Sequence, residues 1–165
     1  MSCIVLIGMP GAGKSTLGVQ LAKETARDFV DTDVMIQLRE GKTLQAIIDG
    51  SDYLNLRRIE EEILSSLDIS HHVVATGGSA VYSDLGMNKL KTLGPVIFLD
   101  VDLAELRQRI DNYDHRGIAR RTDQSFEDLY IERRGLYNKY ADFVIDCNGK
   151  KQHVVLRELQ KILKN

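Results

Sequence analysis

The sequence has only two cysteines, Cys3 and Cys147, and neither lies in the close spacing of a metal site. Both fall in apolar runs, so we expect reduced thiols in the core and no zinc or redox site. No apolar run approaches the roughly 18 residues that a membrane span needs, and no signal-peptide pattern precedes the first apolar run. These absences predict a cytoplasmic protein with no membrane partner.

The sequence also lacks an excess of positive charge. Its 22 lysines and arginines against 24 aspartates and glutamates give a formal net charge of −2. A protein that binds nucleic acids without regard to sequence has a basic surface, so we expect no nucleic-acid partner. Nor is there an internal repeat, a low-complexity tract or a linker. A chain of 165 residues with 43% hydrophobic content is expected to form one domain, residues 1–165, and we expect a monomer.

The stretch that most constrains function is residues 3–16, CIVLIGMPGAGKST. A short apolar run is followed by the full P-loop pattern G-x-x-x-x-G-K-[ST], and helical spacing resumes after it. Gly11 and Gly13 let the backbone approach phosphate oxygens closely, because they have no Cβ. Lys14 is expected to bind the β- and γ-phosphates, and the Ser15 hydroxyl to bind Mg²⁺. The sequence therefore predicts a nucleoside triphosphate site.

Strand-like and helix-like segments alternate along the whole chain, which predicts an α/β fold with a mainly parallel sheet. The predicted strands are residues 3–7, 28–31, 72–76, 96–99 and 143–145. After the helix that follows the P-loop, the predicted helices are residues 34–39, 43–50, 51–67, 84–93, 103–110, 125–140 and 154–163. Residues 111–124 are polar and without a period, and we expect a mobile lid there.

The helix predicted over residues 51–67 has a specific expected start and buried face. Ser51 is the expected N-cap, because serine side chains accept hydrogen bonds from the free N–H groups of a first helical turn. The expected apolar stripe is Leu54, Ile59, Ile63 and Leu67.

Polar residues follow the second and third predicted strands, where ligands collect in open α/β sheets. If the second strand continues, Asp31 and Asp33 project to the same side, near the P-loop. A carboxylate there can accept a hydroxyl proton or hold a water molecule on Mg²⁺. The alternative is that Asp33 is only a helix N-cap. The turn at residues 77–79 either approaches a small ligand or only reverses the chain.

Arginines form the other group of candidates. Arg57 and Arg58 lie in one predicted helix, and Arg133 and Arg134 in another; each pair is either part of a site or a solvated face. Arg116, in the predicted lid, can stabilise a transferring phosphoryl group if the lid closes. Two arginines facing a cleft would suit a carboxylate-bearing substrate.

In this order, the motifs resemble those of the shikimate kinase family over nearly the whole chain. The matching segments are the P-loop, Asp31-Thr32-Asp33, Leu56-Arg57-Arg58-Ile59-Glu60, Thr76-Gly77-Gly78 and Arg133-Arg134-Gly135-Leu136-Tyr137, continued by Ala141-Asp142. The resemblance implies a three-layer P-loop kinase fold. Its five-stranded parallel sheet would have the order 2-3-1-4-5, with helices on both faces and a mobile lid. It also implies transfer of the γ-phosphoryl group of ATP, with Mg²⁺, to a hydroxyl of shikimate, giving shikimate 3-phosphate.

The resemblance also implies roles for single residues. Catalysis would involve Lys14, Asp33 as the base, and Arg116. Nucleotide binding would involve Gly11, Ala12, Gly13, Lys14, Ser15, Thr16, Arg109 and Arg116. The substrate-binding region would be about residues 33–60, together with the glycine turn after the third strand and an arginine in a later helix. The substrate-binding residues would be Asp33, Arg57, Gly77, Gly78 and Arg133. The metal would lie at Ser15 and Asp31.

The sequence departs from the family pattern at several positions. Ser79 stands where the family prefers a third glycine, and Gly117 and Gly135 stand where it prefers proline. Leu56 replaces a phenylalanine, and the family's Gly-Glu is Gly50-Ser51 here, at a different spacing to Arg57. The arginine that often lies near adenine is missing from residues 148–151.

The sequence also bears on other classes of P-loop protein. A GTPase needs N-K-x-D, and residues 138–141 read NKYA at the end of a helix. Residues 96–100 could be the Walker B strand of an ATP-driven machine, but the chain is short for such an assembly. A gluconate-type or nucleotide kinase, and a non-catalytic ATP-binding module, remain the alternatives.

Overall fold

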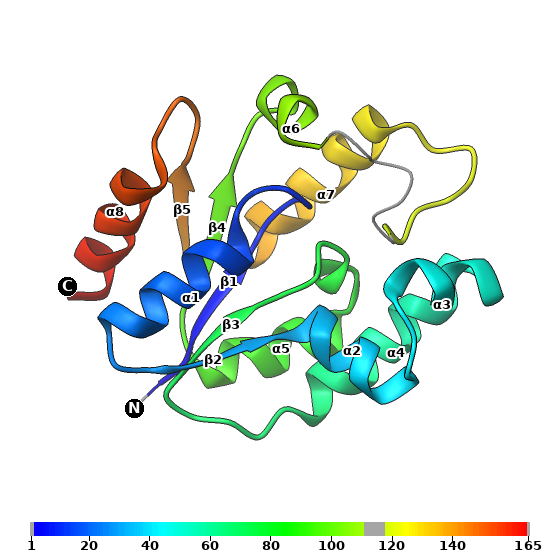
Figure 1. The fold of residues 1–165 in the computed structure, drawn as a ribbon, viewed down its shortest axis with the longest axis horizontal. Coiled ribbons are helices and arrows are strands. Elements are labelled where there is room, and N and C mark those ends of the chain that lie inside the picture. Colours follow the sequence, from blue (N-terminus) through cyan, green and yellow to red (C-terminus); the bar gives the residue numbers. More distant parts are fainter. Residues whose placement is uncertain (1, 111–117, 165) are drawn as a thin grey trace.

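The computed structural model describes residues 2–110 and 118–164, which form an α/β structure with helices on both faces of a central sheet (Figure 1). All pairings between the strands are parallel, and the strand order is β2-β3-β1-β4-β5, as predicted. The strands are β1 (Ile4–Ile7), β2 (Asp28–Asp31), β3 (His72–Ala75), β4 (Val96–Asp100) and β5 (Phe143–Asp146).

The helices agree with the predicted segments to within a few residues. They are α1 (Lys14–Glu24), α2 (Thr32–Glu40), α3 (Leu44–Gly50), α4 (Tyr53–Ser66), α5 (Asp84–Leu93), α6 (Leu103–Arg109), α7 (Phe126–Tyr140) and α8 (Gln152–Lys164), with a short 3₁₀ helix η1 (Ala80–Tyr82). Helix α1 packs against α8 on one face, and α5 packs against α4 on the other (Figure 1). Right-handed crossovers account for this division, because the connections run in opposite directions from β1.

The core confirms the interpretation of the apolar strand-like runs. Residues Ile4–Ile7 are buried on both faces of the sheet, as expected for the central strand of a parallel sheet. Cys3 and Cys147 are both buried and free, as predicted. A second apolar cluster joins α2, α3 and α4, and its members are Ile36, Ile47, Leu56, Ile59, Ile63 and Ala119. Three members of this second cluster, Ile36, Leu56 and Ala119, also line the pocket at the carboxyl edge of the sheet.

Two expectations about α4 are wrong. Asp52 is the N-cap, accepting a hydrogen bond from the backbone N–H of Asn55, while the Ser51 hydroxyl donates to the carbonyl of Ile47 at the end of α3. Leu54 is 55% exposed, and Leu56 is buried in its place. Residues that are two positions apart in an α-helix point about 200° away from each other around the helix axis. Because Leu56 faces the core, Leu54 faces solvent.

Strand β2 ends at Asp31, so it does not continue to Asp33 as the expected common orientation of the two aspartates requires. Thr32 already begins α2, and Asp31 is its N-cap: one carboxylate oxygen accepts hydrogen bonds from the N–H groups of Asp33 and Val34. The two aspartates therefore do not share a strand face, and the N-cap is Asp31, not Asp33. Asp33 lies in the first helical turn instead.

Part of the predicted lid, residues 111–117, lies outside the described residues, and so does Arg116. Residues 118–124 are described, and Ala119 and Gln124 are buried there. No helix among the described residues is long and apolar enough to cross a membrane.

Two helical glycines give a matched test of this packing. A Cβ on Gly135, in α7, would meet nothing within 4 Å, whereas a Cβ on Gly18, in α1, would lie 2.7 Å from the ring of Phe29. Gly135→Ala is therefore expected to stabilise the fold by about 0.5–1 kcal/mol, because alanine restricts the unfolded chain. Gly18→Ala should destabilise it, because α1 must move away from β2. Thermal unfolding of both variants checks this; stabilisation by both would contradict the packing of α1 on β2.

Candidate functional site

The P-loop connects β1 to α1 in the geometry that the motif requires. Gly11 and Gly13 have φ values of 85° and 96°, in the left-handed region that glycine adopts without strain. Lys14 is buried, and its Nζ donates to the carbonyl oxygens of Gly8 (2.6 Å) and Met9 (2.9 Å). Its ammonium group therefore lies over the loop, on the side where the α1 N-terminus points.

Two side chains with oxygen atoms that can coordinate Mg²⁺ lie beside the loop. The Ser15 hydroxyl donates to Asp31 Oδ2 at 2.6 Å, so the first turn of α1 and the end of β2 are joined at this point. Hydroxyl and carboxylate oxygens are the hard ligands that Mg²⁺ prefers. No group of three or more His, Cys, Asp or Glu among residues 2–110 and 118–164 forms a metal cage by itself. Ser15 and Asp31 fit a metal that takes its other ligands from phosphate and water.

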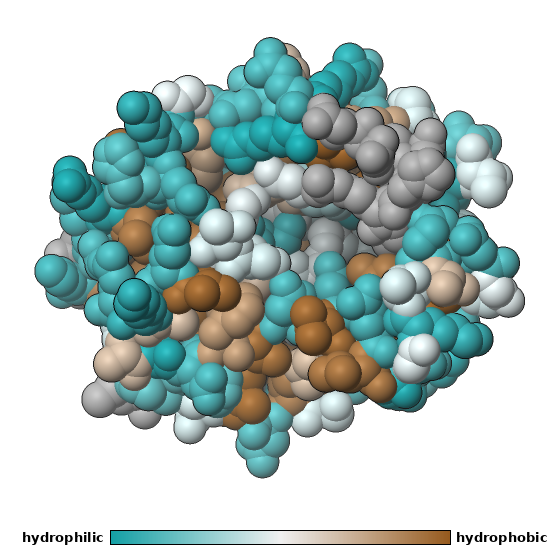
Figure 2. Space-filling view, viewed as in Figure 1, coloured by the Kyte–Doolittle hydropathy of each residue, from teal (hydrophilic) through white to brown (hydrophobic). Residues whose placement is uncertain are grey.

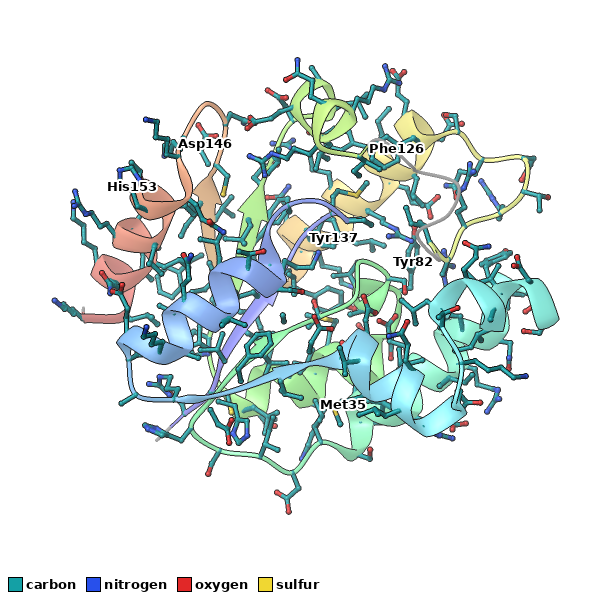
Figure 3. All side chains as sticks on the ribbon, viewed as in Figure 1. Met35, Tyr82, Phe126, Tyr137, Asp146 and His153 are labelled. Carbon is teal, nitrogen blue, oxygen red and sulfur yellow. The ribbon has the colours of Figure 1, made fainter. Side chains whose placement is uncertain are left out.

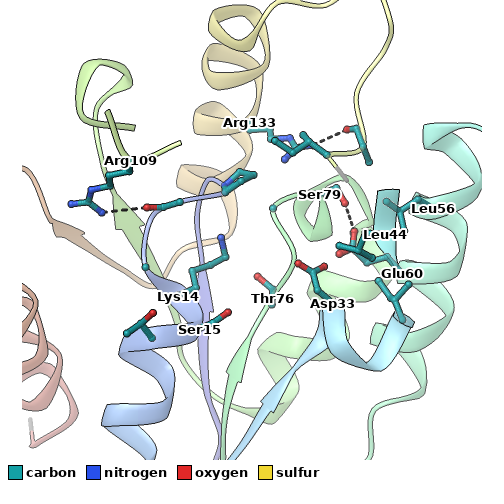
Figure 4. Close-up of a pocket in the computed structure, with 18 residues that line it drawn as sticks. Lys14, Ser15, Asp33, Leu44, Leu56, Glu60, Thr76, Ser79, Arg109 and Arg133 are labelled. Atoms are coloured by element: carbon teal, nitrogen blue, oxygen red, sulfur yellow. Dashed lines mark hydrogen bonds between the residues drawn. The ribbon is translucent and has the colours of Figure 1, made fainter. Parts of the chain in front are cut away.

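A pocket of about 500 Å³ lies at the carboxyl edge of the sheet, between the P-loop, α2, α4 and α7 (Figure 4). In the space-filling view, this face of the molecule is hollowed near its centre (Figure 2). The pocket has an apolar side made of Ile36, Leu44 and Leu56. Its polar lining includes Lys14, Ser15, Thr16, Asp33, Glu60, Thr76, Ser79, Arg109 and Arg133.

The turn after β3 brings backbone to the centre of the polar side. A Cβ on Gly77 would lie 2.5 Å from Asp33 Oδ1 and closer still to a carboxyl oxygen of Glu60. A Cβ on Gly78 would lie 2.7 Å from Arg133 Nη1 and 2.9 Å from the ring of Pro10. Neither position has room for a side chain. Because these two residues are glycines, the carboxyl groups of Asp33 and Glu60 (the carboxyl pair) and the guanidinium group of Arg133 can all lie against the same turn.

Arg133 is a buried cation without a carboxylate partner among the described residues. Its side chain comes from α7, is 1% exposed, and lines the pocket. Nη2 donates to the carbonyl of Ala119 at 2.7 Å, while Nε is buried without a hydrogen-bond partner. Tyr137, one turn further along α7, donates to the carbonyl of Gly78 at 2.6 Å and holds the helix against the turn (Figure 3).

Arg57 lies beside the pocket rather than in its lining. Its guanidinium carbon is 3.5 Å from the centre of the Tyr82 ring, and Arg133 lies over the same ring at 5.5 Å. Figure 3 labels Tyr82, whose hydroxyl donates to Glu132. Arg57 lines an adjoining hollow of about 340 Å³, and Ser79 lines both hollows. One aromatic ring therefore brings two guanidinium groups to one end of the site.

Burial changes the acid–base properties of three groups in the pocket. It lowers the pKa of Lys14 to about 8, although Asp33 partly opposes this. It raises the pKa of Asp33 to about 6, with help from the neighbouring charge of Asp31. It raises the pKa of Glu60 to about 7, with help from the charge of Asp33. Perturbed groups gathered in one cleft are typical of catalytic sites.

Most residues named from the sequence meet in this pocket. Its lining includes the predicted Gly11, Gly13, Lys14, Ser15, Thr16, Asp33, Gly78, Arg109 and Arg133. Arg109 donates to the carbonyl of Gly11 at 3.3 Å and pairs with Glu105. The structure does not bring Ala12, Asp31, Gly77 or Arg57 into the lining: Ala12 is buried in the core, Asp31 contacts Ser15, Gly77 lies under the carboxyl pair, and Arg57 stacks on Tyr82.

The neighbouring arginines, Arg58 and Arg134, are surface residues that pair with side chains outside the pocket. Arg58 is exposed and pairs with Glu62 at 2.5 Å. Arg134 is exposed and forms two hydrogen bonds to Asp100, at 3.2 and 2.8 Å. The carboxylate of Asp100, at the end of β4, is therefore paired with Arg134.

Glu60, Ser79 and Tyr82 have no predicted role of their own. Glu60 carried a detectable signal, because it shares a helix face with Leu56, Ile59 and Ile63 and is therefore a carboxyl in an apolar stripe. Ser79 and Tyr82 carried none, because their contacts join η1 to α4 and α7 across the fold.

The raised pKa of Glu60 predicts how stability depends on pH. The pKa rises from 4.5 to about 7 on folding, so the native state retains a proton that the unfolded state loses; stability should fall as the pH rises between these values. Glu60→Gln is therefore expected to stabilise the fold by about 1–3 kcal/mol near pH 7.5 and to have little effect near pH 4. Urea unfolding at both pH values, with Glu61→Gln as the matched control, measures this. An equal effect of Glu60→Gln on stability at both pH values would contradict the raised pKa of Glu60 in the folded protein.

Comparison with known proteins agrees with the geometry. The family model described as shikimate kinase matches residues 10–164. A shikimate kinase from Clostridium botulinum (strain Eklund 17B / Type B) is 35% identical over 164 residues, covering 98% of this chain and 97% of that protein. One from Francisella tularensis subsp. holarctica is 32% identical, covering 97% and 93%.

Solved structures give the same result. A shikimate kinase from Acinetobacter baumannii in complex with shikimate has a TM-score of 0.87 and 30% identity, covering 100% of this chain and 94% of that one. Shikimate kinase from Aquifex aeolicus has a TM-score of 0.81 and 28% identity, covering 98% and 96%. With the family model matching almost the whole chain and relatives above 30% identity along its length, this protein belongs to the shikimate kinase family.

Proposed function

We propose that this chain transfers the γ-phosphoryl group of ATP to a hydroxyl group of shikimate, giving ADP and shikimate 3-phosphate. The observation that carries the proposal is Arg133, a buried cation that lines one pocket with Lys14 and Asp33 and has no carboxylate partner among the described residues. Leaving a buried charge unpaired is costly, and a substrate carboxylate would compensate it with two parallel hydrogen bonds.

The nucleotide half of the site has the parts that phosphoryl transfer needs. Lys14 and the P-loop N–H groups are positioned to bind the phosphates, and Arg109, on the other side of the loop, is assigned to the base of the nucleotide. Ser15 and Asp31 are the residues that would hold Mg²⁺, which when bound neutralises charge on the phosphate oxygens. Arg116 keeps its proposed role as the lid arginine, although it lies outside the described residues.

The acceptor half holds the substrate between a base and two cations. Asp33 is the proposed base: it lines the pocket on α2 and, with a pKa of about 6, is ionised at neutral pH. Arg133 and Arg57 are the proposed ligands of the substrate carboxylate, and Tyr82 holds them at the same end. The Gly77-Gly78 turn has no side chains, which lets Asp33, Glu60 and Arg133 lie close to the backbone, beside the place we propose for the carbocyclic ring of the substrate. We also propose that the enzyme acts as a cytoplasmic monomer without a membrane partner. We propose no nucleic-acid partner either, which the net charge of −2 supports.

Rate measurements with several acceptors test this function directly. ADP formation with ATP and Mg²⁺ is expected with shikimate, and only background formation with gluconate, with CMP or without an acceptor. Turnover with gluconate or CMP instead would assign the chain to a related small-molecule kinase. ATP binding without turnover of any acceptor would support the binding-module alternative and contradict the proposal.

The two arginines of α4 provide a matched pair for the acceptor site. Arg57→Met should raise the KM for shikimate about tenfold or more, with a much smaller change in the KM for ATP, because a charge-assisted contact to the carboxylate is lost. Arg58→Met removes a surface pair with Glu62 and should leave both constants nearly unchanged. Steady-state kinetics with each substrate varied in turn give both values. If the two variants behave alike, Arg57 does not bind the acceptor.

A further inference from the structure

Two aromatic rings contact the guanidinium group of Arg57. The guanidinium carbon lies 3.5 Å from the centre of the Tyr82 ring and 4.9 Å from the centre of the Tyr53 ring, which comes from the preceding turn of α4. Nε of Arg57 is buried without a hydrogen-bond partner, and within the described part of the chain no carboxylate pairs with this side chain. The described contacts of the guanidinium group are thus made through its flat faces, not through its N–H groups.

The ring of Tyr82 is itself anchored. Tyr82 ends the short helix η1, is half-buried, and donates its hydroxyl to Glu132 Oε1 on α7 at 2.5 Å (Figure 3 labels the tyrosine). The other oxygen of that carboxylate, Oε2, accepts a hydrogen bond from Nε2 of the buried Gln124 at 3.2 Å. A tyrosine whose hydroxyl has a fixed partner keeps its ring in one place. One face of the ring is therefore held toward Arg57.

The ring lies where two positive charges come together. Arg133 is 5.5 Å from the centre of the same ring. Burial lowers the pKa of Arg57, and the charge of Arg133 lowers it further, while the charge of Glu132 acts in the opposite direction. The face of an aromatic ring attracts a guanidinium group without using its N–H groups, which lie in the guanidinium plane. Stacking on Tyr82 thus offsets part of the repulsion between the arginines and leaves the N–H groups for an anion.

We propose that Tyr82 is a positioning residue, whose ring holds the guanidinium group of Arg57 in the orientation that binds the substrate carboxylate. The hydrogen bond to Glu132 fixes the ring. This inference rests on the proposed function, in which the acceptor is shikimate. Tyr82 lines the adjoining hollow and not the pocket that contains Lys14, so it acts through Arg57 and does not touch the reacting atoms. Without the ring, a long side chain repelled by Arg133 would occupy several orientations.

Kinetics of two variants of Tyr82 test the role of the ring. Tyr82→Leu should raise the KM for shikimate about three- to tenfold and change kcat and the KM for ATP less than about twofold, because the contact to the carboxylate is the same in the ground state and the transition state. Tyr82→Phe keeps the ring and loses the bond to Glu132, so its KM for shikimate should lie between those of the wild type and Tyr82→Leu. A phenylalanine variant as impaired as the leucine variant would show that the ring contributes nothing, and the inference would be wrong.

A double-mutant cycle tests whether Tyr82 acts through Arg57. In an Arg57→Met background, Tyr82→Leu should change the KM for shikimate less than about twofold, because the group that the ring positions is already absent. The same increase in KM in both backgrounds would contradict the inference, since Tyr82 would then affect the site without Arg57.

Tyr140 on α7 provides the matched control. Its hydroxyl also donates to a carboxylate, that of Asp84, and the Nζ of Lys139 lies 4.7 Å from the centre of its ring, but none of these residues lines the pocket. Tyr140→Leu should cost stability, because the tyrosine is 5% exposed in the core, and should leave the KM for shikimate unchanged. If it raises this KM as much as Tyr82→Leu does, the role of Tyr82 is only structural and the inference is wrong.

A spectrum of the free enzyme separates this inference from the proposed function. In protein labelled with ¹³C at the arginine Cζ, the Arg57 resonance is identified by its absence in Arg57→Met, and the ring current of Tyr82 should shift it upfield. Tyr82→Leu should move it downfield, and Tyr140→Leu should not move it. A resonance that stays in place in Tyr82→Leu would overturn the inference even if shikimate is phosphorylated. A moved resonance without shikimate turnover would support the hold of the ring on Arg57 and refute the substrate assignment.

Discussion

The site depends on one physical constraint: charges taken out of water at the carboxyl edge of the sheet must be balanced across the pocket. Lys14, Glu60 and Arg133 are buried, and Asp33 lies half-buried between them. None of the four forms an ion pair within 4.0 Å with another described residue. These charges therefore interact over longer distances, and the interactions contribute to the shifted pKa values of Lys14, Asp33 and Glu60. Such a pocket remains open to an anionic ligand.

The fold produces this arrangement because four elements end at the same edge. Parallel strands bring the P-loop, the start of α2 and the turn after β3 together, and α7 packs across them through Tyr137. Small residues then decide how closely the charged groups approach, since neither Gly77 nor Gly78 has room for a Cβ. The distances between the charged groups of the pocket are thus set by backbone packing as much as by the charged residues themselves.

Local patterns were enough to predict the P-loop and the alternation of helices and strands, whereas the strand order was an implication of the resemblance to the shikimate kinase family. The P-loop pattern, the alternation of helices and strands, and the caps at Thr43 and Ser125 are all encoded within a few neighbouring residues. The failures have equally local causes: Asp52 competes with Ser51 for one helix start, and Asp31 caps α2 instead of extending β2. The pairing of Glu60 with Ser79 and the stacking of Arg57 on Tyr82 were not predictable, because each contact joins residues from different elements.

Under the proposed function, the guanidinium groups of Arg57 and Arg133 bind the carboxylate of the substrate. Calorimetric titration of the nucleotide-free protein with shikimate and with its uncharged methyl ester tests this most directly, because the two ligands differ only at that group. We expect shikimate to bind and the ester to bind at least about tenfold more weakly, since the ester cannot accept two charge-assisted hydrogen bonds. Equal affinity for the two ligands would contradict it.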